Sequence, residues 1–519
     1  MDHELLLFWL IATSSLANPL VTLRRLRLAA PGWLGLHLTI LAVAFVGWFW
    51  EEPAVFYVAA GMWGLFVLIP ALASRLFSRC FLQQRYAAAR RCAWVIRCLH
   101  PADAWREMPQ ILRALELAQQ GGFASASEVL GRFEHGTSAI SLVAVANLYR
   151  ITNQWERFLA WESQHRQSIE RHPGMLPIML RARGETGDVP GLVECYDRHR
   201  HQIGRMSPAA SRDMCRLMLF AFCGKRPAIE RLFSGSLAVS PAPVQAFWLA
   251  TADLVAGDKS ARSQFEELLP AADPMLRRAI ERRLTQILPP TSLLPSLEGV
   301  VDGIVSDQSH EETFGLRRSF FSSRACATQV LLVLNVLMFA LEYYMGGGED
   351  GDVLYRLGAL CPPAVRAGEW WRLLSACFLH FGPMHLALNM FGLWLLGPFV
   401  EFALGFRRFV FLYLLAGTGS MAAGCVFGFR AGAESLAVGA SGCIMGLVGA
   451  TAALMLRGWV RERADAAKRR LLLMLTLIIM EIVFDSMVPD VSMTAHLSGA
   501  IIGFVAAMFL QDRLRPRVA

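Results

Sequence analysis

A serine flanked by small residues, in the stretch Gly439-Ala440-Ser441-Gly442, has the features of a nucleophile placed near the start of a helix. Glycine on either side leaves room for a substrate backbone to approach and for a strained turn. Residues 436–456 carry no charged side chain and are long enough to cross a bilayer as a helix. Because serine and small residues are also ordinary packing residues in membrane helices, this stretch alone does not establish a catalytic role.

A histidine later in the chain, His496, can supply the base that such a serine needs. Imidazole is the usual group that activates a serine hydroxyl near neutral pH. His496 lies in the apolar residues 492–510, where an ionisable side chain is costly and indicates function. Small residues recur at every fourth position of both segments, which allows two helices to approach closely; they are Gly442, Gly446 and Ala450, and Ala495, Gly499 and Gly503. We therefore predict that Ser441 and His496 meet as a catalytic pair.

Two polar residues four positions apart, His385 and Asn389, have the chemistry to stabilise an oxyanion. They share one face of a predicted helix, and both side chains can donate hydrogen bonds together with the backbone N–H of Ser441. Polar residues that only tie helices together would show the same pattern. His380 is five residues before His385 and is predicted to point elsewhere, so we expect no metal site from these histidines.

Composition predicts a multi-pass membrane protein with a soluble insert. The chain has 519 residues, which is too long for one domain. Hydrophobic residues make up 55% of it, a larger share than a purely soluble protein has. The net charge of +8 comes from Lys and Arg beside apolar segments, where they orient the chain in the membrane, so nucleic acid is not an expected partner. Eleven cysteines occur singly, which indicates neither a disulfide framework nor a zinc site.

Residues 1–80 are predicted to hold two or three membrane spans. Residues 31–50 and 54–74 are long enough to cross a bilayer, and residues 5–21 are a shorter apolar segment with an acidic start that is unlike a secretory signal. Glu51 and Glu52 separate the two longer segments, whereas arginines lie before and after them. Since basic residues stay on the cytoplasmic side, the chain that follows is predicted to be cytoplasmic.

Residues 81–290 are predicted to form a soluble helical domain, because apolar residues recur at helical spacing without a segment long enough to span. Turn residues recur about every 34 residues, the length of a helix-turn-helix repeat; they are Gly122, Asn153, Gly187, Gly224 and Gly257. The domain resembles tetratricopeptide repeats, although most of that family's Trp, Tyr and Pro signature is missing. A repeat solenoid would bind a protein partner on its concave surface, and an irregular helical bundle is the alternative.

Residues 291–324 contain Pro, Gly, Asp and Ser and are predicted to be a linker.

Six apolar segments follow in residues 325–519: 325–345, 380–400, 409–429, 436–456, 471–488 and 492–510. Glu481 and Asp485 interrupt the fifth. Basic residues precede the first segment and follow the second, fourth and sixth, which puts them all on one side if the first span begins in the cytoplasm. The count places Ser441 and His496 near the outer face. The expected fold is all-α, with a six-helix membrane bundle, a soluble helical domain and N-terminal spans.

The six-span region resembles the rhomboid intramembrane serine proteases. The matching features are Trp371-Arg372, His380, His385, Asn389, Gly397, Glu401, Gly439-Ala440-Ser441-Gly442, Ala495-His496, Gly499 and Gly503. The resemblance implies that Ser441 is the nucleophile and His496 the general base and acid. It implies oxyanion donors at His385, Asn389 and the Ser441 amide, with support from Gly439 and His380, and no cofactor.

Met445 departs from the family pattern, which usually has Phe or Tyr four residues after the nucleophile. A flexible thioether orients a histidine less firmly than a ring, so slower turnover is expected.

The resemblance implies an intramembrane serine endopeptidase of the bacterial inner membrane that cuts transmembrane segments of other proteins near the outer face. Its expected partners are transmembrane protein substrates and the lipid bilayer. A rhomboid-like chaperone or escort that binds transmembrane helices without cutting is the alternative, but loss of the serine or histidine would then be expected. A transporter would require two matching halves, and the sequence contains no such repeat.

Overall fold

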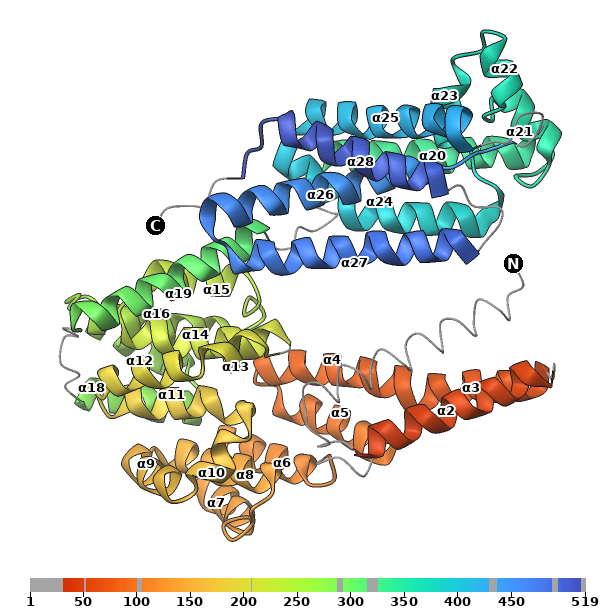
Figure 1. The fold of residues 1–519 in the computed structure, drawn as a ribbon. Coiled ribbons are helices and arrows are strands. Elements are labelled where there is room, and N and C mark those ends of the chain that lie inside the picture. Colours follow the sequence, from red (N-terminus) through yellow and green to blue (C-terminus); the bar gives the residue numbers. More distant parts are fainter. Residues whose placement is uncertain are drawn as a thin grey trace. The chain divides into compact units, whose positions relative to one another are not determined.

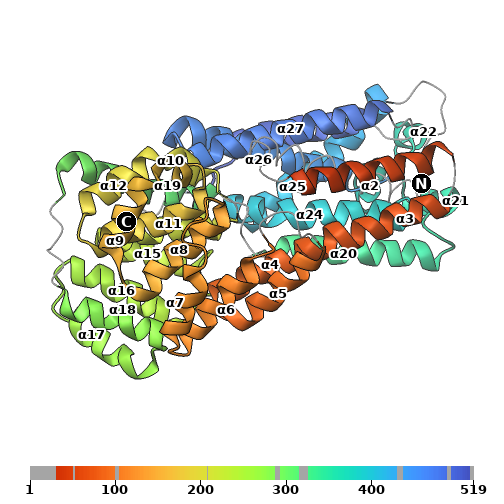
Figure 2. The ribbon, with the colours of Figure 1, turned by 90° about the horizontal axis from the view of Figure 1, so that it is seen from below.

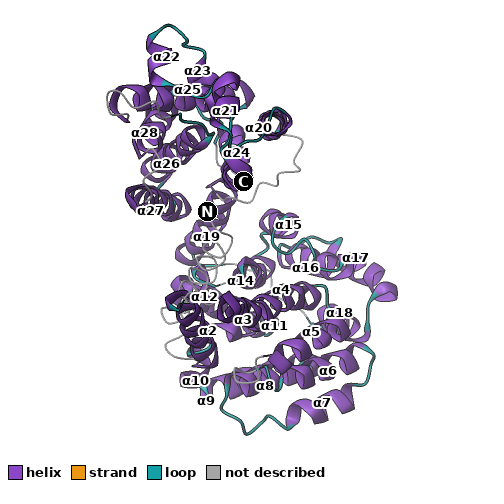
Figure 3. Ribbon diagram, turned by 90° about the vertical axis from the view of Figure 1, so that its right-hand side faces the viewer, coloured by secondary structure: helices purple, strands orange, loops and turns teal. Residues whose placement is uncertain are grey.

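The computed structural model describes residues 31–50, 53–99, 105–206, 208–286, 293–314, 325–428, 436–487 and 493–514. Regular structure within these ranges is helical, apart from one isolated β-bridge between Leu360 and Ala437 (Figure 3). The predicted all-α fold class is confirmed. The chain divides into two compact units, Met1–Asp302 and Gly303–Ala519. The apolar segment predicted at residues 5–21 lies outside the described residues.

The helices described first in this unit are α2 (Pro31–Phe49), α3 (Pro53–Trp63), the π-turn η1 (Gly64–Leu68), α4 (Ile69–Leu82) and α5 (Tyr86–Leu99). Because α3, η1 and α4 follow one another without a gap, they form one extended helix (Figure 2). Its residues Tyr57–Leu82 are long and apolar enough to cross a membrane. The two longer N-terminal segments predicted from the sequence are therefore helices, and the second is longer than predicted.

The rest of the first unit consists mainly of short helices. They are α6 (Met108–Gln119), α7 (Phe123–Gly131), α8 (Ala139–Thr152), α9 (Trp155–Gln164), α10 (Arg166–Glu170), η2 (Pro173–Met175), α11 (Leu176–Glu185), α12 (Val189–Arg198), α13 (Arg200–Gly204), α14 (Ala209–Phe222), α15 (Arg226–Ser234), α16 (Ala242–Val255), α17 (Ala261–Leu268), η3 (Leu269–Ala271) and α18 (Pro274–Thr285). Neighbouring helices contact each other in the pairs α6 with α7, α8 with α9, α11 with α12, α14 with α15, and α16 with α17. The domain is thus a series of helical hairpins.

The turns of these hairpins share a left-handed backbone conformation. Asn153, Gly187, Gly224 and Gly257 have φ angles of 55°, 83°, 68° and 85°. At the first hairpin the positive φ belongs to Gly121 rather than to the predicted Gly122. Glycine and asparagine tolerate this conformation best, which explains their periodic recurrence in the sequence. The assignment of the hairpins to tetratricopeptide repeats stays a prediction.

The central part of the predicted linker, residues 291–324, is helical, whereas its composition indicated turns and loop; that these residues link two domains stays a prediction. Residues 295–314 form the helix α19 (Pro295–Phe314), in which Ile304 and Phe314 are buried. Phe314 packs where a side chain on Gly458 would otherwise lie, and its carbonyl oxygen accepts a hydrogen bond from Arg470. Burial of apolar side chains stabilised a helix here despite the loop-like composition.

The second unit contains long helices joined by short ones. They are α20 (Cys326–Tyr344), α21 (Gly351–Leu357), α22 (Pro362–Arg366), α23 (Arg372–Ser375), η4 (Ala376–Phe378), α24 (Gly382–Leu404), α25 (Phe406–Ala423), the π-turn η5 (Gly424–Gly428), α26 (Ser441–Glu462), α27 (Asp465–Met487) and α28 (Met493–Phe509). Each of the six predicted segments corresponds to one long helix, and α24 to α28 lie side by side (Figure 1). Among the described residues, α20, α24, α25 with η5, and α26 are apolar and long enough to span, whereas α28 is shorter.

α26 is the central helix of this unit. It contacts α24, α25, α27 and α28, and 78% of its most apolar 18-residue stretch is buried, against 17 to 50% for the other helices that are long and apolar enough to span a membrane. A segment that is apolar on every side is expected to be enclosed in this way. The residues at the N-terminal end of α26 are therefore held by several helices at once.

Glu401, near the end of α24, fixes the start of α20. Its carboxylate is 3% exposed and accepts hydrogen bonds of 2.8 Å from the amides of Ala327 and Thr328 and from the Thr328 hydroxyl. The first N–H groups of a helix have no partner within it. A negative charge at this end also interacts favourably with the helix dipole. Glu401 thus serves as a cap supplied by another helix.

We expect Glu401→Gln to destabilise the second unit. The amide turns an N–H group toward backbone donors and removes the charge, which should lower the free energy of unfolding by about 1–3 kcal/mol. Unfolding of the purified protein in detergent measures this, with Glu349→Gln as the control because Glu349 is exposed. Equal stability of the two variants would contradict the capping role.

Candidate active site

The predicted nucleophile, Ser441, is the first residue of α26 and is partly exposed. Because the first N–H groups of a helix are not bonded within it, the Ser441 amide can face a substrate. The sequence predicted a helix from residue 436 onward, which was wrong for residues 436–440. Residues 436–439 form a non-helical stretch instead, and Ala440 is a turn residue that caps α26.

Backbone pairing holds this non-helical stretch. Ala437 and Leu360 exchange two backbone hydrogen bonds of 2.9 and 3.0 Å. The N–H of Gly439 donates to the carbonyl oxygen of Ala376 over 2.9 Å. The segment that leads into Ser441 is thereby fixed to the chain between α21 and α24.

Gly439 can only be glycine in this arrangement. Its φ angle of 135° is one that other residues rarely adopt. A Cβ atom at this position would lie 2.8 and 2.9 Å from the Cε1 and Nε2 atoms of His385, and 3.6 Å from the Oγ atom of Ser441. The backbone of Gly439 therefore brings the His385 ring and the Ser441 hydroxyl to the same place.

The hydrogen bonding of His385 determines which of its nitrogens can donate. Its Nδ1 atom accepts a hydrogen bond of 3.3 Å from the backbone N–H of Phe381. A neutral imidazole with Nδ1 as acceptor carries its proton on Nε2, the atom that faces Gly439. His385 is thus prepared as a donor beside Ser441.

Asn389 lies one turn further along α24 and is 6% exposed. Its Nδ2 atom donates to the His385 carbonyl oxygen over 3.0 Å. An amide nitrogen has two N–H groups, so one remains for another acceptor. The predicted common face of His385 and Asn389 agrees with this contact.

His380 does not point away from His385 as predicted. The two rings meet edge to face with centroids 5.4 Å apart. His380 precedes α24, so helical spacing does not apply to it. Its backbone N–H donates to Glu342 over 3.0 Å, and its ring is fully buried. The buried His380 ring thus packs against the His385 ring and limits its movement.

α28 is packed directly against α26. A Cβ atom on Gly499 would collide with the carbonyl oxygen of Gly442, and one on Gly503 would collide with that of Gly446. These contacts agree with the predicted close approach of the small residues on the two helices. His496 therefore lies on a helix whose backbone touches the first turns of α26.

The side chain of His496 faces two carboxylates of α27. Its Nδ1 atom is 3.0 and 3.1 Å from the two Asp485 oxygens and 3.2 Å from Glu481 Oε1. One nitrogen of His496 and one carboxylate oxygen each of Glu481 and Asp485 lie within 4.8 Å of one another. Because Nδ1 is engaged, Nε2 is the nitrogen of His496 left to act on a serine.

The described residues contain no hydrogen bond between Ser441 and His496. Such bonds are commonly long in a free enzyme and tighten when substrate binds. Sequence reasoning treated Glu481 and Asp485 only as interruptions of an apolar segment. The available signal was that these two carboxylates lie four residues apart, and so on one face of a helix, in the segment just before the one that contains His496.

Residues 367–513 match the family model for a rhomboid domain. The C-terminal part of this chain is a rhomboid domain. Rhomboid proteins are multi-pass membrane proteins and generally intramembrane serine proteases. The matched residues include α24 to α28 and therefore Ser441, His496, His385 and Asn389, whereas α20 lies outside them.

Relatives with a rhomboid domain come from bacteria, plants and protozoa. The chain is 29% identical over 336 residues to the rhomboid protease GluP of Bacillus subtilis, which is 62% of this chain and 58% of that protein. It is 35% identical over 171 residues to RHOMBOID-like protein 5 of Arabidopsis thaliana, or 33% of this chain and 53% of the relative. It is 28% identical over 167 residues to Rhomboid-like protease 1 of Toxoplasma gondii, or 32% and 56%.

The chain thus spans between 53 and 58% of the length of these relatives. No solved structure matches it.

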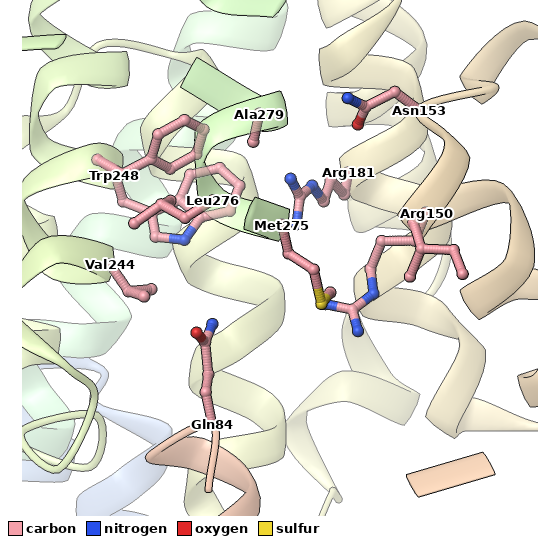
Figure 4. A pocket seen from close by; sticks show the side chains of 11 residues that line it. Gln84, Arg150, Asn153, Arg181, Val244, Trp248, Met275, Leu276 and Ala279 are labelled. Carbon is pink, nitrogen blue, oxygen red and sulfur yellow. The ribbon is translucent and has the colours of Figure 1, made fainter. Parts of the chain in front are cut away.

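A second candidate site lies in the helical hairpins of the first unit. A cavity of about 60 Å³ is lined by eleven residues, among which Arg150, Arg181, Gln84 and Met275 extend toward a shared space (Figure 4). The Arg181 guanidinium lies 5.0 Å from the ring centroids of both Trp155 and Trp248. Stacking on aromatic rings holds a guanidinium in one orientation.

Positive charge exceeds negative charge at this cavity. Glu185 accepts hydrogen bonds from Arg181 over 3.0 Å and from Arg283 over 2.7 Å. Burial alone would raise the pKa of Glu185, but these guanidinium groups hold it below its ordinary value. Arg150 has no acidic partner among the residues described, and its buried Nη2 atom has no hydrogen-bond acceptor there. An anionic group would satisfy this nitrogen.

We expect Gly439→Ala to inactivate Ser441 toward a fluorophosphonate probe, which reacts with activated serines. The added methyl group would displace the His385 ring, and loss of one oxyanion donor typically costs about 100- to 1000-fold in rate. Gly368→Ala is the matched control, because Gly368 also has a positive φ of 108° but open space around it. Similar labelling of both variants would contradict the proposed contact.

Proposed function

We propose that this protein is an intramembrane serine endopeptidase that cuts transmembrane segments of other membrane proteins. The observation that carries the proposal is the placement of Ser441 at the start of α26, beside the donor face of His385. His496 lies on the helix packed against it. The family match adds to this geometry, since rhomboid proteins are generally proteases of this kind.

The proposed reaction begins with proton transfer from the Ser441 hydroxyl to Nε2 of His496. Oγ bonds to the carbonyl carbon of the scissile peptide, and the carbonyl electron pair moves to the oxygen. The Ser441 amide, His385 Nε2–H and the Asn389 amide stabilise that oxyanion. The imidazolium then gives its proton to the peptide nitrogen as the C–N bond breaks, and water releases the acyl group by the same steps.

The proposed cleavage site lies near the outer face of the membrane. The basic residues that precede and follow the long helices sort to one side if the chain before α20 is cytoplasmic, and the N-terminus of α26 then faces outward. We propose the bacterial inner membrane as the location, with transmembrane proteins and the surrounding lipid as the partners. No cofactor takes part in the proposed mechanism.

We expect purified protein to cut a reporter that carries one transmembrane helix with a small residue near its outer end. Ser441→Ala and His496→Ala should each lower the rate by at least about a thousandfold, since nucleophile and base act as a unit. Ser498→Ala is the control, because Ser498 lies on α28 and its hydroxyl donates to the Ala495 carbonyl oxygen of the same helix. Mass spectrometry of the products locates the cut.

A cut in the cytoplasmic half of the reporter would contradict the proposed orientation. Equal cleavage by the wild type and Ser441→Ala would exclude Ser441 as nucleophile. Wild-type protein that binds the reporter without cutting it would favour the alternative function, a membrane chaperone or escort.

We propose that the helical hairpins of the first unit recruit a protein partner through the arginine-lined cavity. The cavity is large enough for a carboxylate, which Arg150 and Arg181 would bind by charge-assisted hydrogen bonds. Trp248 and Met275 would contact an adjacent apolar side chain. A peptide that ends in an apolar residue with a free carboxylate has this chemistry.

We expect a fluorescent hexapeptide ending in leucine to bind the full-length protein in detergent, and its C-terminally amidated form to bind more weakly. Arg150→Gln should raise the Kd of the free-carboxylate peptide by about 10- to 100-fold, the range of a lost hydrogen bond to a charged group. Arg157→Gln serves as the control because Arg157 is exposed. Equal binding of both peptides in a fluorescence anisotropy titration would contradict the proposal.

A further inference from the structure

We infer that Asp485 is a positioning residue for His496, so that the proposed Ser441 and His496 pair operates as a triad with a member on α27. This role rests on the proposed function. It adds to the site a side chain that neither the sequence motifs nor the family match assigns.

The contact geometry favours Asp485 as the member that orients the ring. Both of its oxygens lie within 3.1 Å of Nδ1, and its side chain is 1% exposed. The His496 side chain is 10% exposed. A buried carboxylate has little freedom to turn away, and its attraction to the ring is screened much less by water and salt than that of an exposed one. Asp485 therefore restricts both the rotation and the tautomer of the imidazole.

The tautomer follows from hydrogen-bond chemistry. An ionised carboxylate can only accept, so Nδ1 carries a proton while it faces Asp485. In the neutral ring the lone pair is then on Nε2, which is the atom that must take the proton from Ser441. The opposite tautomer would present an N–H to the serine and could not act as a base.

The charge of Asp485 also favours the reaction step itself. When Nε2 takes the serine proton, the ring becomes a cation at hydrogen-bond distance from the carboxylate. Attraction between buried opposite charges is stronger than in water, so the charge pair is stabilised as it forms. The proton stays on His496 until the leaving nitrogen takes it, and Asp485 remains ionised throughout.

Glu481 has a smaller part in this arrangement. It is four residues before Asp485 and shares its helix face, but its side chain is 36% exposed and only one oxygen approaches Nδ1, at 3.2 Å. Solvent reduces the interaction of an exposed charge. Nδ1 has one proton to donate, and the buried carboxylate is the better placed acceptor.

The test is the rate at which Ser441 reacts with a fluorophosphonate probe, together with kcat and KM for reporter cleavage by the full-length protein. Asp485→Asn should lower the labelling rate and kcat by about 100- to 10,000-fold, as loss of the orienting carboxylate does in serine protease triads. KM should not change, because the buried Asp485 side chain offers a substrate no exposed surface to bind. Glu481→Gln should lower kcat by less than about tenfold.

Two further variants separate positioning from a structural role. Asp465→Asn makes the same substitution at the exposed first residue of α27 and should react at the wild-type rate. Asp485→Glu keeps the carboxylate and should recover part of the kcat lost in Asp485→Asn. A merely structural residue would alter thermal stability and KM and would not be rescued in this way.

Equal labelling of wild type and Asp485→Asn would overturn the positioning role and leave the proposed function intact. Wild-type protein that neither labels nor cuts would overturn both. Labelling that is lost on chelation and restored by zinc would make Glu481, Asp485 and His496 a metal site, and this too would overturn the inference.

Discussion

Backbone contact between α26 and α28 is the constraint on which the site depends. A Cβ atom on Gly499 would meet the carbonyl oxygen of Gly442, and the same holds for a second glycine pair one turn further on. Because no side chains separate the two helices, their contact is made by atoms that cannot change rotamer. The register of α28 against α26 is thereby fixed, and with it the relation between Ser441 and His496.

The loops at the start of α26 provide the second constraint. Arg372 is 4% exposed, and its Nη1 atom donates to the carbonyl oxygens of Tyr355 and Ala359 over 2.8 and 3.0 Å. This bond holds the segment whose next residue, Leu360, pairs with Ala437 ahead of the nucleophile. Arg372, one of the residues on which the sequence resemblance was based, thus acts on the loop backbone.

Buried acidic residues serve different purposes in the two units. A buried charge is costly unless it is paired or hydrogen-bonded. Glu185 meets this requirement with two arginines, and Glu401 meets it with helix-terminal amides. Asp485 instead faces a histidine, the one of these partners that changes its charge near neutral pH. The pairing that a buried carboxylate requires therefore stabilises the fold at Glu185 and Glu401, whereas at Asp485 it orients a titratable histidine.

The sequence alone determined the features that depend on local chemistry. Apolar segments predicted the long helices, periodic Gly and Asn predicted the turns, and residue type and spacing indicated Ser441, His496 and His385. Tertiary structure decided the rest. Pairing with a distant loop delayed the start of α26, and the chain entering α24 placed His380 against His385. Only the packing of α27 against α28 turned Asp485 toward His496, because the rotation of one helix against another depends on contacts between distant residues.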